Sequence, residues 1–150
     1  MRAPLHRPAL GDDEGSTLPL VIFYGSLALA LVLIVAAASS LYLERKRLFT
    51  LADDAALVGA ESFDLNSVTL TGHGVRPILQ PAQVHAAVTS YLAGNPVDTF
   101  EGLVVEKATT VDGESATVTV SAIWHPPVVT VFVPDGMRID ATAVARSVFG

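Results

Sequence analysis

The chain of 150 residues contains no cysteine. A disulfide framework, a thiolate metal site and a cysteine nucleophile are therefore excluded. The lack of cysteine does not place the protein in a compartment, because cysteine-free domains suit either side of a membrane. The chemistry of the protein must be sought in its other residues.

Basic residues are scarce in the larger part of the chain. From Leu48 to the C-terminus there are eleven acidic residues and only four basic ones, namely Arg76, Lys107, Arg138 and Arg146. A domain with this negative balance is poorly suited to bind nucleic acid or to dock on anionic lipid. We therefore expect no nucleic-acid partner.

Charge of either sign is missing between Leu18 and Leu43. A helix over this run is about 39 Å long, which exceeds the roughly 30 Å hydrocarbon core of a bilayer. Tyr24 and Tyr42 lie about 27 Å apart along such a helix, close to the separation of the two membrane interfaces. We predict one membrane-spanning helix at residues 16–43, after a short N-terminal tail at residues 1–15. The residues expected at its interfaces are Tyr24, Tyr42, Arg45, Lys46 and Arg47.

A cleaved secretory signal is a poorer interpretation of this run. The apolar stretch is about twice as long as the usual apolar region of a signal peptide. Asp12, Asp13 and Glu14 precede it, where a signal peptide carries basic residues. A core helix of a soluble protein rarely stays apolar on all sides over so many turns. The pattern favours a retained membrane anchor.

The charges at the two ends of the span leave its orientation open. Arg2 and Arg7 precede it, and Arg45, Lys46 and Arg47 follow it. A strict count of positive charges places the C-terminal part in the cytoplasm. A tail of about 100 residues, however, can be translocated largely regardless of local charge.

A helical stalk is expected at residues 44–63, directly after the span. Its apolar residues recur every three or four positions, which places them on one helix face. Ala52, Ala56 and Ala60 form a ridge of small side chains between Phe49 and Phe63. Small residues at this spacing let another element approach closely. The ridge is either a buried stripe facing the domain's own sheet or a face for helix–helix assembly. A second apolar face is offered by Leu51, Ala55 and Val58.

Residues 64–150 are expected to form one small α+β domain. Ser67 to Thr71 and Val75 to Leu79 are predicted as two short strands joined by a turn at Gly72 to Gly74. A helix is then expected to begin at Pro81 and to end at Gly94, before Pro96. Its apolar stripe consists of Val84, Val88 and Leu92.

Asp112-Gly113 predicts a hairpin with a two-residue turn. In that register Val105 lies opposite Val120, Leu103 opposite Ala122, and Glu106 opposite Thr119. The side chains expected on the buried face are Leu103, Val105, Ala116, Val118, Val120, Ala122 and Trp124. Thr117, Thr119 and Ser121 are expected mainly on a hydroxyl-rich open face.

The turn Pro134-Asp135-Gly136 is followed by a predicted last strand. Ile139, Ala141, Ala143 and Ala145 alternate there with polar residues, and this alanine-lined face is expected to meet the ridge of the stalk. Val128 to Val133 is either a buried strand or an apolar edge that accepts a strand of another subunit. The fold class is therefore α+β, with a long N-terminal helix packed on a small antiparallel sheet.

No constellation in the sequence supports catalysis, and we expect no catalytic, cofactor-binding or metal-binding residues. The histidines of the domain, His73, His85 and His125, lack the spacing of a metal site. No serine stands in a nucleophile elbow. Asp53 and Asp54 point about 100° apart on a helix. The two carboxylates therefore suit a solvated face or an ion pair with the basic residues 45–47.

Three segments resemble the TadE/TadG-like proteins of Tad (Flp) pilus assembly: residues 14–20 with the apolar run behind them, the basic step Glu44 to Arg47, and residues 51–57. The closing segment Ile139 to Arg146 is similar to the final strand of that group. The resemblance implies a pilin-like, non-enzymatic membrane protein with a cytoplasmic N-terminus and an outward-facing domain. It implies other pilus or secretion-system membrane subunits as partners, the lipid bilayer as surroundings, and a homo- or hetero-oligomer.

One departure concerns processing by a prepilin peptidase. Processed members of this system carry a glutamate five residues after a glycine, and the fifth residue after Gly15 is Leu20. Gly15-Ser16 is thus the candidate bond, and we expect no efficient cleavage there. An uncleaved protein suits an anchor or assembly factor better than a shaft subunit. The alternatives are a membrane-tethered binding or sensory module unrelated to pili and a cytoplasmic-facing regulatory subunit.

Overall fold

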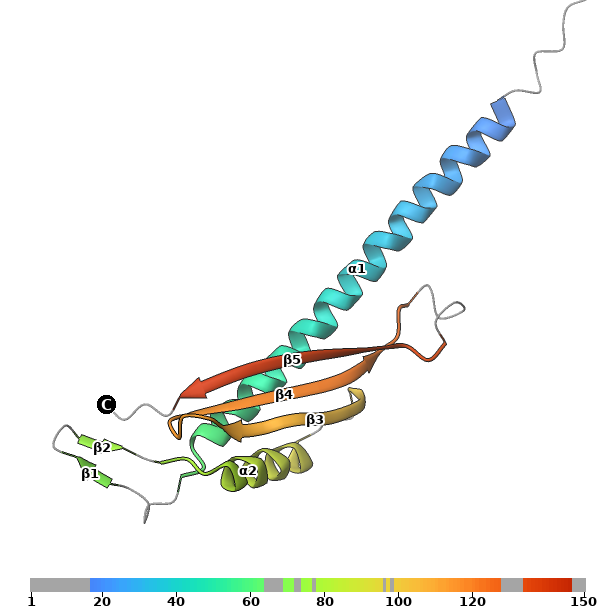
Figure 1. The fold of residues 1–150 in the computed structure, drawn as a ribbon. Coiled ribbons are helices and arrows are strands. Elements are labelled where there is room, and N and C mark those ends of the chain that lie inside the picture. The colour runs from blue at the N-terminus through green and yellow to red at the C-terminus, as the bar shows by residue number, and fades with distance from the viewer. Residues whose placement is uncertain are drawn as a thin grey trace, which may run out of the picture. The chain divides into compact units, whose positions relative to one another are not determined.

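The computed structural model describes residues 17–63, 78–95, 97, 99–127 and 134–146, together with the backbone of 69–71 and 74–76. The predicted α+β class is confirmed: a long apolar helix and a second helix accompany a three-stranded antiparallel sheet (Figure 1). The chain divides into two compact units, Met1–Ala36 and Ala37–Gly150.

Helix α1, Thr17–Ala60, is one uninterrupted helix of 44 residues. It passes from the uncharged run into the basic step without a break, and α1 contains no proline after Pro19. Pro19 lies in the first turn, where its missing N–H removes no helical hydrogen bond. The expected continuation of the apolar helix into a stalk is therefore present in the backbone.

Helix α2, Pro81–Gly94, has the predicted bounds. Pro81 stands at its N-terminus, and Val84, Val88 and Leu92 are its buried residues. Ahead of it lies an antiparallel hairpin formed by β1, Thr69–Thr71, and β2, Gly74–Arg76. This hairpin confirms the predicted pair of short strands, although Gly74, which was predicted in the turn, begins β2. Leu79, which was expected at the end of the second strand, instead lies between β2 and α2 and is buried.

The main sheet has the order β3-β4-β5, with β3 at Glu101–Thr110, β4 at Ser115–Trp124 and β5 at Met137–Arg146. Both pairings are antiparallel. Figure 1 shows the three strands side by side and α2 beside β3. The last strand alternates as predicted, since Ala141, Ala143 and Ala145 are buried and the residues between them are exposed.

The predicted two-residue turn at Asp112-Gly113 is wrong. The last ladder pair of β3 and β4 is Thr110 with Ala116, and four residues, Val111 to Glu114, connect the two strands. The opposition of Val105 and Val120 is confirmed. Glu106 does not face Thr119, because an irregularity between Val105 and Lys107 brings Lys107 opposite Thr119. Such a bulge gives one strand an extra residue and lets a longer turn coexist with the correct pairing further along.

The buried face of β4 carries all five residues predicted for it: Ala116, Val118, Val120, Ala122 and Trp124. Leu103 and Val105 pack partly buried against the same core. The core joins residues of α1, α2 and all three long strands in one cluster. Its side chains are mostly alanine and valine, which keeps the helices close to the sheet.

Candidate membrane anchor and packing surface

The first part of α1 presents apolar side chains on every side. Between Thr17 and Val35 its large apolar residues are 47–67% exposed, apart from the half-buried Leu33. By length and composition, α1 is able to cross a membrane. Because contiguous apolar surface of this size is unfavourable in water, the segment requires lipid or another apolar partner around it.

The residues predicted at the membrane interfaces are solvent-accessible. Tyr24 and Tyr42 are 60% and 67% exposed, and the ring of Tyr24 packs edge-on against Phe23 with centroids 5.6 Å apart. Arg45, Lys46 and Arg47 are all exposed. Arg47 Nη1 lies 3.9 Å from Glu44 Oε2, one helical turn back. The charged residues 44–47 thus lie on α1 immediately after the uncharged run.

The alanine ridge lies inside the domain's own core. Ala52 and Ala56 are fully buried and Ala60 is 2% exposed, in the cluster that contains β4, β5 and α2. Of the two interpretations of the ridge, a buried stripe facing the sheet therefore describes the structure of this chain. Phe49, by contrast, is half exposed, and Phe63 packs partly buried at the edge of the core.

The buried face of α1 is broader than the ridge of Ala52, Ala56 and Ala60. It also includes Leu48, Ala55 and Gly59. Leu48, Ala52, Ala55 and Gly59 follow one another at steps of three and four, so the same periodicity that revealed the ridge contained this signal. Gly59 was missed because a lone glycine within a helix contributes nothing to an apolar pattern.

Three elements approach one another closely at Gly59. A Cβ atom at this position would lie 3.1 Å from the Cβ of Ala116 on β4 and 3.2 Å from Cγ1 of Val84 on α2. Cγ2 of Val88 would lie 3.4 Å away. Glycine therefore lets the end of α1 settle between the sheet and α2, and the stalk is part of the domain's core.

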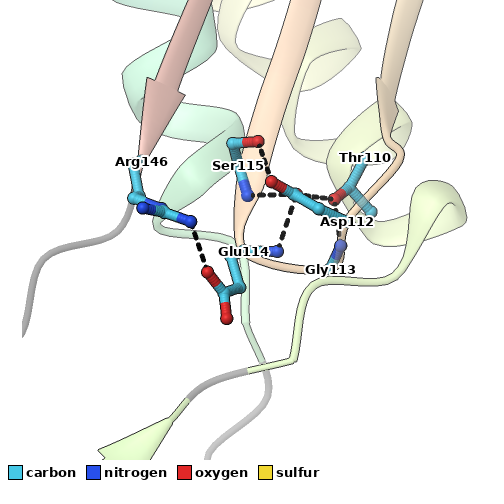
Figure 2. A network of polar contacts seen from close by, with 6 residues as sticks. All are labelled: Thr110, Asp112, Gly113, Glu114, Ser115 and Arg146. Carbon is cyan, nitrogen blue, oxygen red and sulfur yellow. Dashed lines mark hydrogen bonds and ion pairs between the residues drawn. The ribbon is translucent and has the colours of Figure 1, made fainter.

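The turn between β3 and β4 is held by the carboxylate of Asp112 (Figure 2). Oδ1 accepts hydrogen bonds from the backbone N–H of Glu114 at 2.9 Å and of Ser115 at 2.7 Å, and Oδ2 accepts one from Ser115 Oγ at 2.7 Å. These donors, first the Ser115 hydroxyl and then the backbone N–H groups, hold the pKa of Asp112 well below its usual value. The turn therefore keeps a fixed negative charge at neutral pH.

Two further contacts tie this turn to its surroundings. Gly113, at φ +73°, donates its N–H to Thr110 Oγ1 at 3.0 Å and accepts the N–H of Leu79 at 2.8 Å. Arg146 at the end of β5 pairs with Glu114 (Figure 2). The turn thus connects β3, β4 and β5 with the segment that leads into α2.

Ser121 departs from the expected open face. It is 1% exposed, although Thr117 and Thr119 are only half-buried. Ser121 Oγ donates to Glu106 Oε1 at 2.6 Å and accepts from Arg138 Nη1 at 2.8 Å. The side chains of a bulged residue on β3 and of a β5 residue therefore cover this hydroxyl, an arrangement that alternation alone does not predict.

The other end of β4 contacts α1 through the single tryptophan of the chain. Trp124 Nε1 donates a hydrogen bond to Ser40 Oγ at 3.3 Å, and Trp124 is 8% exposed. Next to it, His125 Nδ1 lies 3.2 Å from Glu101 Oε2 at the start of β3. Both contacts lie within the unit that begins at Ala37.

Asp53 and Asp54 lie on the exposed side of α1, and His85 is exposed on α2. Within the described residues, no group of three or more histidine, aspartate or glutamate side chains is arranged to hold a metal ion. His73, the Gly15-Ser16 bond and the segment Val128 to Val133 lie outside the described residues.

A comparison with protein-family models finds a match to the family described as "Putative Flp pilus-assembly TadE/G-like" over residues 15–62. No curated protein and no solved structure matches the chain. The matched segment contains all of α1, from its exposed apolar part to its buried alanine face. The family match agrees with the resemblance noted in the sequence: residues 15–62, in the N-terminal region of this chain, are similar to the TadE/G-like family of Flp pilus assembly.

Proposed function

We propose that the protein is a non-enzymatic, membrane-anchored component of a Tad/Flp-type pilus or a related secretion apparatus. The main support for the proposal is that two features lie on the same helix, α1. The segment that matches the TadE/G-like family also contains the part of α1 whose large apolar side chains are exposed on every side. In this proposal α1 anchors the chain in the membrane and carries the small domain at its C-terminal end.

The proposed topology has the N-terminus in the cytoplasm and the domain of residues 64–150 outside the membrane. Residues 1–15 form the cytoplasmic tail, residues 16–43 contain the span, and residues 44–63 form the stalk. What supports this orientation is the family relation, because the charges at the two ends of the span are nearly balanced. The partners proposed for it are other membrane subunits of the apparatus.

The assembly contacts are assigned to the exposed apolar part of α1. The ridge of Ala52, Ala56 and Ala60 is already occupied by the chain's own core, so a bulky substitution there disturbs folding before it disturbs assembly. Side chains such as Leu29 and Ile34, which are 60% and 64% exposed, remain available to neighbouring helices in the bilayer.

The test is a deletion in the organism that carries the protein, complemented with variants of the full chain. The wild-type chain and a Thr50→Arg control, which alters an exposed residue after the apolar run, are expected to restore surface pili. A Leu29→Arg/Ile34→Arg variant should lose both membrane insertion and pili, because charges in the hydrocarbon core are unfavourable. Normal piliation of the deletion strain contradicts the proposed function.

We further propose that Gly15-Ser16 stays intact and that the protein acts as an anchor or assembly factor. Leu20 occupies the position at which processed relatives carry a glutamate. The intact mass of the protein extracted from membranes tests this point. A mass that includes residues 1–15 supports an anchor, and loss of those residues contradicts it.

A further inference from the structure

The unit that contains the sheet includes the last residues of the uncharged run. Fewer residues of that run therefore remain to cross the bilayer. The unit that contains the sheet begins at Ala37. Within it Ala37, Ser40 and Leu41 are half-buried, on the same helix face as the fully buried Leu48. The contact between Trp124 Nε1 and Ser40 Oγ shows that the end of the sheet covers this stretch.

Charged groups of the sheet lie at the same end. Ile123 is opposite Glu101 on β3 and opposite Arg138 on β5, and His125 contacts the Glu101 carboxylate at 3.2 Å. If the hydrocarbon core extended to Leu43, these groups and the strand ends that carry them would be drawn into it. Charges and open strand edges are strongly unfavourable there.

The remaining helix is still long enough. Leu18 to Ala36 spans about 28 Å, close to the roughly 30 Å of a hydrocarbon core. Ser40 then lies about 6 Å beyond Ala36 along α1, within the thickness of a headgroup layer. The membrane boundary consequently falls before the residues that contact the sheet.

We propose that the Trp124 end of the sheet lies in the headgroup layer of the membrane in which α1 is anchored. Exposed apolar side chains at this level include Met137, which is opposite Trp124 in the ladder, and Tyr42. They are 47% and 67% exposed, and amphipathic or apolar side chains next to a polar surface suit an interface. The occupant of this surface is thus phospholipid, and the hydrocarbon span ends near Ala36.

This inference rests on the proposed membrane anchoring, so the experiment first separates the two. The full chain is reconstituted into phosphatidylcholine/phosphatidylglycerol vesicles and floated on a density gradient. Failure to float with the vesicles overturns anchoring, and with it the interface. Flotation confirms anchoring, and the depth of Trp124 is then measured independently.

Trp124 is the only tryptophan, so its emission reports one site without any substitution. Vesicles carry a nitroxide quencher at the headgroup, high on the acyl chain, or near the chain's end. We expect the headgroup and shallow labels to quench Trp124 at least about twofold more than the deep label, as for a residue in the interface. Strongest quenching by the deep label overturns the proposal, and so does the absence of quenching by any label.

A Trp124→Phe/Val111→Trp variant is the matched control. Val111 is 83% exposed in the turn at the opposite end of β4, about 30 Å away along the strand. Its emission should be insensitive to all three lipid labels. Equal quenching at both positions overturns the assignment of the lipid contact to the Trp124 end.

The absence of cysteine allows a second measurement of the boundary. Ser39→Cys and Val35→Cys introduce thiols at two exposed positions of α1. In vesicles, a membrane-impermeant maleimide should label Ser39→Cys and leave Val35→Cys unlabelled, relative to Val111→Cys as the measure of accessible protein. Protection of Ser39→Cys to the level of Val35→Cys places the boundary beyond the sheet contact and overturns the proposal.

Discussion

Gly59 of α1 and Ala116 of β4 approach so closely that a Cβ on Gly59 would lie 3.1 Å from the Cβ of Ala116. Val84 and Val88 of α2 close the same space from the other side. The stalk portion of α1 can therefore pack this closely in the core because Gly59 has no side chain.

Replacing Gly59 with leucine should destabilise the domain. The larger side chain must displace Ala116 and Val84, and overpacking of this kind costs about 1–3 kcal/mol. Gly94, at the end of α2, has no atom within 4 Å of an added Cβ, so Gly94→Leu is the matched control. Denaturant unfolding in detergent micelles, followed by Trp124 emission, should show a lower midpoint for Gly59→Leu alone; equal midpoints would show that the contact is not tight.

The buried hydroxyl of Ser121 should be energetically coupled to Glu106. Ser121→Ala removes a hydrogen bond of 2.6 Å to Glu106 and one of 2.8 Å from Arg138. The two charged partners are half-exposed and regain water, so we expect a loss of about 1 kcal/mol. A double-mutant cycle with Glu106→Ala measures the coupling. Strict additivity of the two substitutions would contradict a shared network.

The turn at Asp112 predicts a specific acid sensitivity. Because its hydrogen bonds hold the pKa of Asp112 below the ordinary value of 3.8, the carboxylate stabilises the folded domain at pH values above about 4. This contribution is lost progressively as the pH falls below 3.8, since the unfolded chain takes up the proton first.

Thermal unfolding of wild type and Asp112→Ala between pH 7 and pH 2 checks this expectation. The difference between the two midpoints should be largest near neutral pH and should shrink below pH 4. Asp54→Ala, on the exposed side of α1, is the control. Its unfolding midpoint should depend on pH in the same way as that of the wild type. A difference that stays constant down to pH 2 would exclude the charge of Asp112 as the cause.

Sequence periodicity predicted the elements whose burial repeats regularly. The apolar stripe of α2, the alternation of β5 and the buried face of β4 all follow from spacings of three to four or of two residues. The flanking proline and glycine also marked the two ends of α2. Local patterns of this kind need no knowledge of the neighbouring elements.

What sequence reasoning missed depends on contacts between distant residues. The bulge near Glu106 changes the register by one residue, and the Asp112-Gly113 dipeptide gave no sign that four residues would connect β3 and β4. Ser121 is buried because Glu106 and Arg138 cover it, and Gly59 matters because Ala116 faces it. Nor did the uncharged run reveal that its last residues contact Trp124.

The most direct test of the account is the topology of the full chain in living cells. Because the natural chain has no cysteine, Val111→Cys in the exposed turn and Ala9→Cys in the N-terminal tail each provide a single thiol. In intact, wall-stripped cells an impermeant maleimide should label Val111→Cys at once and Ala9→Cys only after permeabilisation. Labelling of Ala9→Cys with protection of Val111→Cys would place the domain in the cytoplasm and contradict an outward-facing, membrane-anchored component.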